Sequence, residues 1–75
     1  MILPTKHIST KNSLLGVGAV LLTQLDRPRT VTALWERVRA LPEIGIYERY
    51  ILSLDLLYAI GALDMVDGLL VRSRQ

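Results

Sequence analysis

The C-terminal half of the chain, from Ile46 to Arg72, constrains the fold most strongly. Apolar residues recur at helical spacing over residues 46–60, and Gly61 follows as a residue suited to end a helix. Two short apolar segments then flank Asp67 and Gly68, a dipeptide that accepts positive φ at both central positions of a type I′ turn. A helix followed directly by a C-terminal hairpin is typical of a winged helix-turn-helix domain.

The residues before this half supply two more helices and an arm. We predict a first helix over residues 12–25 and a second one that begins at Thr30 or Thr32 and runs to Leu41, unless residues 30–32 form a short strand. Pro4 disfavours helix at the residue before it, which predicts an extended arm. The expected organisation is an arm over 1–11, a winged-helix domain over 12–72 and a short polar tail over 73–75. The predicted fold class is mainly α with a C-terminal β-hairpin, three helices plus a wing; a three-helix domain with a C-terminal tail is the main alternative.

Helical periodicity predicts which side chains form the core. In the first helix the predicted core face holds Leu14, Gly18, Leu21 and Leu25, and both Gly16 and Gly18 suggest close approach of a second backbone. In the second helix it holds Val31, Leu34, Trp35, Val38 and Leu41, with Trp35 as a core anchor. In the third helix it holds Ile46, Tyr50, Leu54, Leu57 and Gly61, adjoined by Tyr47, Ile51 and Tyr58, while Glu48, Arg49, Ser53 and Asp55 are expected in solvent.

Composition limits the classes of function. A chain of 75 residues has room for one small core, yet 51% of it is hydrophobic, which predicts that part of the apolar surface is covered by a partner. The chain has no cysteine and one histidine, so we expect neither disulfides nor a metal site. Nine basic residues against seven acidic ones are scattered along the chain and form no basic run.

The residues that carry chemistry are sparse. Glu48 and Asp55 lie two helical turns apart without a basic or metal-binding neighbour, and His7 is the only imidazole. Residues 16–18 lack the lysine and the strand of a phosphate-binding loop. We therefore predict that the protein is not an enzyme and has no catalytic, cofactor-binding or small-molecule site.

A winged helix usually binds DNA, and this possibility depends on the third helix. The exposed, N-terminal face of a recognition helix should offer Arg, Lys, Asn or Gln to bases, but here it offers Glu43, Glu48 and Arg49. A small DNA-binding regulator stays as the alternative function, with possible phosphate contacts from Arg37, Arg39, Arg72 and Arg74. A peptide that acts at membranes is less favoured, because the helices are neither long nor strongly basic.

Three apolar residues at helical spacing fall among the polar residues of the third helix. They are Leu52, Leu56 and Ile60, and either the arm or the wing covers them or they form a docking face for a partner protein. The excess of apolar residues favours the docking face. The predicted protein-binding residues are Ile2, Leu3, Lys6 and His7 of the arm together with these three.

The uncharged segment 14–22 is too short to span a bilayer, which takes about 20 residues. No small residues follow it in the pattern of a signal-peptide cleavage site. We expect a cytoplasmic protein.

Four segments resemble the small middle component of bacterial three-component systems built around an ABC-type ATPase. They are ILPTKHI (2–8), LLGVGA (14–19), TVTALWE (30–36) and LDLLYAIGA (54–62). The resemblance implies a winged-helix adaptor that links a large coiled-coil ABC ATPase, related to chromosome-maintenance and DNA-repair ATPases, to an effector protein. It also implies a role in defence against phages or plasmids, without catalytic positions. The expected partners are the ATPase, the effector subunit or both, with DNA as a further possible contact through the complex.

Overall fold

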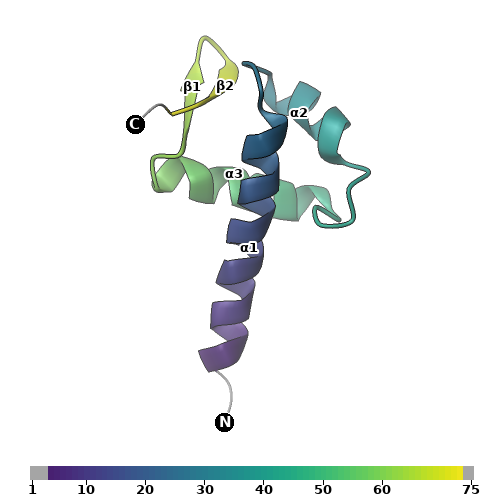
Figure 1. Ribbon diagram of the computed structural model, residues 1–75, viewed down its shortest axis with the longest axis vertical. Coiled ribbons are helices and arrows are strands. Elements are labelled where there is room, and N and C mark those ends of the chain that lie inside the picture. The colour runs from purple at the N-terminus through teal and green to yellow at the C-terminus, as the bar shows by residue number, and fades with distance from the viewer. Residues whose placement is uncertain (1–3, 74–75) are drawn as a thin grey trace.

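The computed structural model describes residues 4–73, with side chains described from Ser13 onward, and shows a winged-helix layout (Figure 1). Over these residues the chain is mainly α, with three helices followed by an antiparallel hairpin, as predicted. The elements are α1 (Pro4–Gln24), α2 (Val31–Val38), α3 (Tyr47–Ala59), β1 (Leu63–Val66) and β2 (Leu69–Arg72).

The helix α1 begins much earlier than predicted. The extended arm expected over residues 1–11 is wrong for residues 4–11, which form the first turns of α1, and residues 1–3 lie outside the described part. Proline suits the first position of a helix, because its missing N–H would have no partner there. No proline or glycine follows before Gly16, so nothing in the sequence interrupts the helix. These first turns extend past α3, away from the other elements (Figure 1).

Local signals define α2. The Thr30 hydroxyl accepts a hydrogen bond from the Ala33 N–H at 3.0 Å, so Thr30 is the N-cap. The helix ends at Val38, earlier than the predicted end at Leu41. Pro42 has no N–H to bond the Val38 carbonyl, and the Leu41 N–H bonds that carbonyl instead at 2.9 Å in a tighter turn.

The wing is a tight hairpin joined to a third short strand segment. Asp67 and Gly68 have φ of 53° and 78°, as the predicted type I′ turn requires. Arg29 and Leu70 exchange two backbone hydrogen bonds, Arg29 N to Leu70 O at 3.2 Å and Leu70 N to Arg29 O at 2.6 Å. The strand considered at residues 30–32 is therefore a single bridge at Arg29, because Thr30 is the helix cap. The strand β2 lies between Arg29 and β1.

The core is centred on the contact between α1 and α3. A Cβ atom built at Gly18 would lie 2.9 Å from Cδ2 of Leu57, so the helices pack closely at Gly18, against a side chain rather than the predicted second backbone. It is wrong for Gly16, where nothing lies within 4 Å. The buried apolar residues come from every element and from the two connections that follow α1 and α2: Val17, Leu21, Leu25, Leu34, Val38, Ile44, Tyr50, Leu54, Leu57, Leu63 and Leu70.

The side chains of α3 that face the core are close to those predicted, and Ser53 and Ile46 are the residues to correct. Tyr50, Leu54 and Leu57 are buried as expected. Ser53 was expected in solvent but is fully buried, at 0% exposure. It lies between Arg49 and Leu57 in one i, i+4 row, and both of those side chains reach α1. Ile46 is exposed because it is the N-cap, with extended φ and ψ, so the helical wheel does not apply to it.

Candidate protein-binding surfaces

The first candidate surface is the outer leucine stripe, which we define as Leu52, Leu56 and Ile60. Leu52 is 46% exposed and Ile60 is 58% exposed, while Leu56 is half-buried. Among the described residues, then, the wing leaves most of the stripe open to solvent. An open apolar stripe of this kind is suited to contact with another protein.

The other four predicted contact residues belong to the N-terminal segment. Ile2 and Leu3 lie outside the described residues. Lys6 and His7 belong to the first turns of α1, and their side chains also lie outside the described part. Their contribution to binding stays a prediction.

The outward face of α3 is acidic and apolar. Glu48, Leu52 and Asp55 are exposed on the side opposite Tyr50. Arg49 is the basic residue of this helix, and its Nη1 donates to Ser13 Oγ of α1 at 2.8 Å. A winged-helix DNA reader presents donors to base edges from this face, and carboxylates there repel phosphates.

The predicted phosphate contacts lie on two different elements. Arg37 of α2 donates from Nε to Gln24 Oε1 at 3.1 Å, and Nη1 of Arg39, the C-cap of that helix, forms an ion pair with Glu36 Oε1 at 3.3 Å. Arg72 is exposed at the end of β2, and Arg74 lies outside the described residues. Two of the guanidinium groups thus already contact side chains of the protein.

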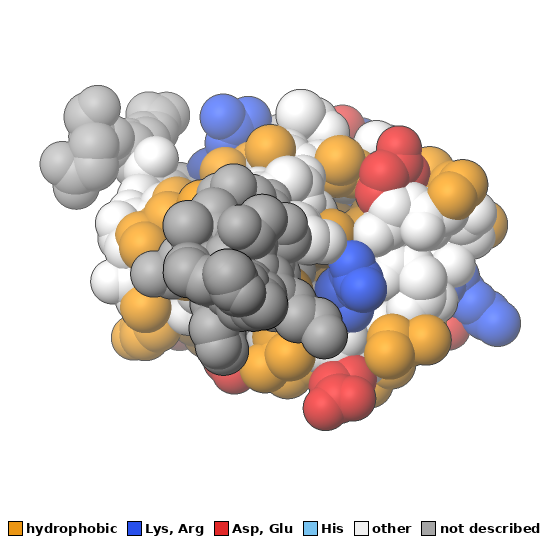
Figure 2. All heavy atoms as spheres, turned by 90° about the horizontal axis from the view of Figure 1, so that it is seen from below, with side chains coloured by type: hydrophobic (Ala, Val, Ile, Leu, Met, Phe, Trp, Pro, Cys, Tyr) orange, Lys and Arg blue, Asp and Glu red, His pale blue; other side chains and the backbone are white. Residues whose placement is uncertain are grey.

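A view from the N-terminal side of α1 shows how the exposed side chains are distributed (Figure 2). Hydrophobic side chains occur in several separate patches on this face, with acidic and basic side chains between them. The described side chains on this face are therefore mixed in charge and do not form a uniformly basic surface for nucleic acid.

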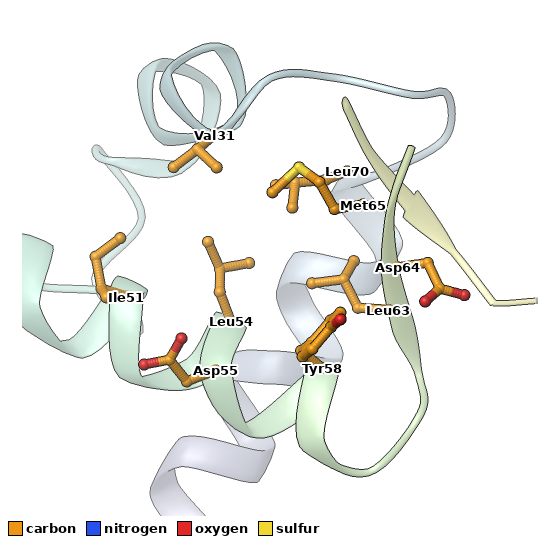
Figure 3. A pocket seen from close by; sticks show the side chains of 9 residues that line it. All are labelled: Val31, Ile51, Leu54, Asp55, Tyr58, Leu63, Asp64, Met65 and Leu70. Atoms are coloured by element: carbon orange, nitrogen blue, oxygen red, sulfur yellow. The ribbon is translucent and has the colours of Figure 1, made fainter. Parts of the chain in front are cut away.

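A second candidate surface is a hollow between α3 and the wing, which sequence reasoning missed (Figure 3). We call it the wing hollow, and its volume is about 390 Å³. It is lined by Val31, Ile51, Leu54, Asp55, Tyr58, Leu63, Asp64, Met65 and Leu70. The hollow depends on how far the wing stands from α3, so no local sequence signal reveals it.

Three aromatic residues connect α2 to α3. Trp35 lies edge-on to Tyr47, with ring centroids 5.0 Å apart, and 5.2 Å from the ring of Tyr50. Tyr50 Oη donates to the Val31 carbonyl at 2.6 Å, and burial raises the pKa of this phenol well above its usual value. Trp35 is half-buried against the core, as its predicted role of core anchor requires.

The connection before α2 is held by Asp26 and Arg29. Arg29 Nη2 lies 2.8 Å from Asp26 Oδ1, and this hydrogen bond lowers the pKa of the carboxyl below its usual value. Because Arg29 also pairs with Leu70 through its backbone, the contact helps to fix the wing against α2.

Neither a cluster of metal ligands nor a membrane-spanning helix occurs among the described residues. No group of three or more His, Cys, Asp or Glu side chains lies close enough together to hold a metal ion within the part of the chain that is described. None of the helices described combines the length and the hydrophobicity needed to cross a membrane.

Fold and surface together define a winged-helix protein whose third helix presents acidic and apolar side chains instead of base-reading ones. The chain belongs to the family described as the ABC-three component (ABC-3C) system Middle Component 6, whose model matches residues 3–74. It is therefore a middle component of a multi-component ABC system, which confirms the resemblance found in the sequence. No curated protein and no solved structure gives a significant match.

Proposed function

We propose that this protein is a non-enzymatic adaptor, which bridges or regulates the large ABC ATPase and an effector protein of its system. The observation that carries the proposal is the outward face of α3, where Leu52 lies exposed between the carboxylates of Glu48 and Asp55. Apolar side chains in this position favour contact with a protein surface, and the carboxylates oppose contact with DNA.

The amount of exposed apolar surface supports an obligate partner. The exposed large hydrophobic residues come from α1, from α3 and the two residues that flank it, and from the wing: Leu15, Ile46, Tyr47, Leu52, Tyr58, Ile60, Met65 and Val66. Single exposed apolar residues are ordinary, but this many on one small domain is more typical of a subunit. We place the adaptor in the cytoplasm, and we assign the complex to defence against phages or plasmids on the strength of the family resemblance.

Co-purification tests the adaptor role. The tagged full chain is expressed together with the other two components of its system, and we expect at least one of them to be retained with it. The double substitution Leu52→Glu and Ile60→Glu changes two exposed positions of the outer leucine stripe, so it should reduce retention without unfolding the chain. Arg39→Glu on α2 is the matched control and should retain the components as the unchanged protein does.

The outcomes separate the adaptor from the DNA-binding regulator. A chain that is monomeric and cooperatively folded alone, and that retains neither component, would contradict the adaptor role. The alternative requires Arg37, Arg39 and Arg72 to contact phosphates, so it predicts duplex binding that weakens steeply as salt rises. An adaptor shows no such binding by itself.

A further inference from the structure

We propose that the wing hollow is a second docking site, which binds an extended segment of a partner protein. That segment inserts one bulky apolar side chain into the hollow and carries a lysine or arginine beside it. This inference rests on the proposed adaptor role and adds a surface and a partner chemistry to it. It is carried by the lining of the hollow, the free edge of β1 and the charge at the rim.

The lining of the hollow is suited to an apolar side chain. Leu54, Leu63 and Leu70 form its nearly fully buried floor, whereas Tyr58 and Met65 at the rim are 62% and 49% exposed. Leu54, Met65 and Leu70 point toward one another across the hollow (Figure 3). With a volume of about 390 Å³, the hollow falls in the size range of pockets that bind ligands.

The strand β1 offers a free edge beside this hollow. Met65 lies opposite Leu70 in the hairpin, and the backbone N–H and C=O of Leu70 bond to Arg29, away from β1. Met65 and Leu70 are therefore a non-hydrogen-bonded pair of the hairpin. In such a pair the backbone N–H and C=O groups of both residues point away from the partner strand. The N–H and C=O of Met65 therefore point to the edge that no described strand covers. An extended segment can pair there by strand addition and direct alternate side chains toward the hollow.

The charge at the rim selects the partner's chemistry. The charged residues that line the hollow are Asp55 and Asp64, both exposed and both acidic. Asp64 Oδ2 accepts a hydrogen bond from Ser73 Oγ at 3.2 Å, and its side chain points away from the centre of the hollow (Figure 3). A lysine or arginine next to the inserted apolar side chain would complement the Asp55 carboxylate, whereas a phosphate backbone would be repelled.

The wing hollow and the outer leucine stripe lie on different sides of α3. At 100° per residue, Leu56 and Tyr58 point in directions about 160° apart. The row of Arg49, Ser53 and Leu57 against α1 also separates the stripe from Leu54 on the hollow side. Two separate surfaces allow the adaptor to hold two proteins at once, which is what a bridging subunit requires.

Photo-crosslinking in the assembled complex tests the docking site. Benzoylphenylalanine replaces Met65 in the full chain, which is purified together with the other two components, and the same residue replaces Arg39 in a control chain. We expect position 65, but not position 39, to crosslink to one segment of a component. That segment should carry a bulky apolar residue with Lys or Arg within about two positions of it.

Affinity measurements provide the second arm. Met65→Asp should weaken binding of the crosslinked component by roughly thirtyfold, and Asp55→Lys by about tenfold, as expected for a central contact and a rim charge. Val66→Asp, at an exposed position on the other face of β1, is the matched control and should change binding less than about threefold.

Each outcome decides one of the two proposals. If the unchanged protein retains neither component, the adaptor role fails and the docking site fails with it. If the complex forms normally but position 65 crosslinks to nothing, to a second copy of this chain, to an acidic segment or to nucleic acid, only the docking site is contradicted. Unchanged affinity of the Met65→Asp variant for both components contradicts it as well.

Discussion

The two sides of α3 differ in how closely they are packed. Toward α1, a glycine brings the helices so near that Leu57 would contact a Cβ at position 18. Toward the wing, Leu54 helps to form the floor of a hollow of about 390 Å³, whose rim residues Tyr58 and Met65 are exposed. One helix therefore has a closely packed side against α1 and a side that borders an open hollow.

The two sides of α3 therefore differ in what they contribute: the α1 side to the stability of the fold, and the wing side to the proposed binding. The α1 side removes apolar surface from water and so stabilises the fold, whereas the wing side keeps Tyr58 and Met65 exposed without a partner in the chain. A small domain that leaves one side of its central helix open loses stability that binding can restore. Substitutions on the two sides should then have different effects.

The largest expected effect is on the closely packed side. Leu57→Ala should lower the free energy of unfolding by about 3 kcal/mol, because it removes a buried side chain and leaves a cavity against α1. Tyr58→Ala, the next residue on the helix, should cost less than about 1 kcal/mol, because Tyr58 is mostly exposed. Urea denaturation measures both, and equal losses would contradict the comparison.

The two glycines of α1 sharpen the same comparison. Gly18→Val should destabilise the protein by about 2 kcal/mol, since the new side chain collides with Leu57. Gly16→Ala should instead stabilise it by up to ~1 kcal/mol, because the position is open and alanine favours helix. Thermal unfolding of the two variants checks the signs, and a stabilising Gly18→Val would show that α1 and α3 are not in close contact.

A smaller effect is expected where α3 meets α2. Tyr50→Phe removes the hydrogen bond from Oη to the Val31 carbonyl and should cost about 1 kcal/mol of unfolding free energy. Tyr47→Phe is the control, because Tyr47 is half exposed and its ring contacts are kept. Denaturation of both variants at neutral pH measures the difference, and no loss in Tyr50→Phe would mean that the hydroxyl is not bonded.

The smallest expected effect concerns Ser53. Its hydroxyl is buried against α1 without a hydrogen-bond partner among the described residues. Ser53→Ala should therefore leave the unfolding free energy unchanged or raise it by about 0.5 kcal/mol. A loss of more than about 1 kcal/mol would show that the hydroxyl makes a bond that stabilises the native state.

Local chemistry explains which parts of the fold could be predicted from the sequence. The turn at Asp67 and Gly68 depends on two φ angles, and the start of α2 depends on one hydroxyl at Thr30, so both could be identified from neighbouring residues. The early start of α1 could not be predicted from the effect of Pro4 on Leu3, the residue before it. A proline also suits the first position of a helix, and Pro4 occupies that position in α1.

The parts that could not be predicted depend on distant contacts. Ser53 is polar, and only the approach of α1 buries it. The wing hollow depends on residues from α2, α3 and both strands, and its size follows from the spacing of these elements. The outer leucine stripe could be predicted because Leu52, Leu56 and Ile60 recur within one short segment, although its binding role stays a proposal.

The most direct test of the adaptor role compares protein and DNA as partners of the same surface. The labelled full chain is titrated, by fluorescence anisotropy at one low salt concentration, with each purified component of its system and with duplex DNA. We predict saturable binding to at least one component, weakened by about tenfold or more in the Leu52→Glu variant, and no binding to the duplex. Salt-sensitive binding to the duplex with no response to either component would contradict the account.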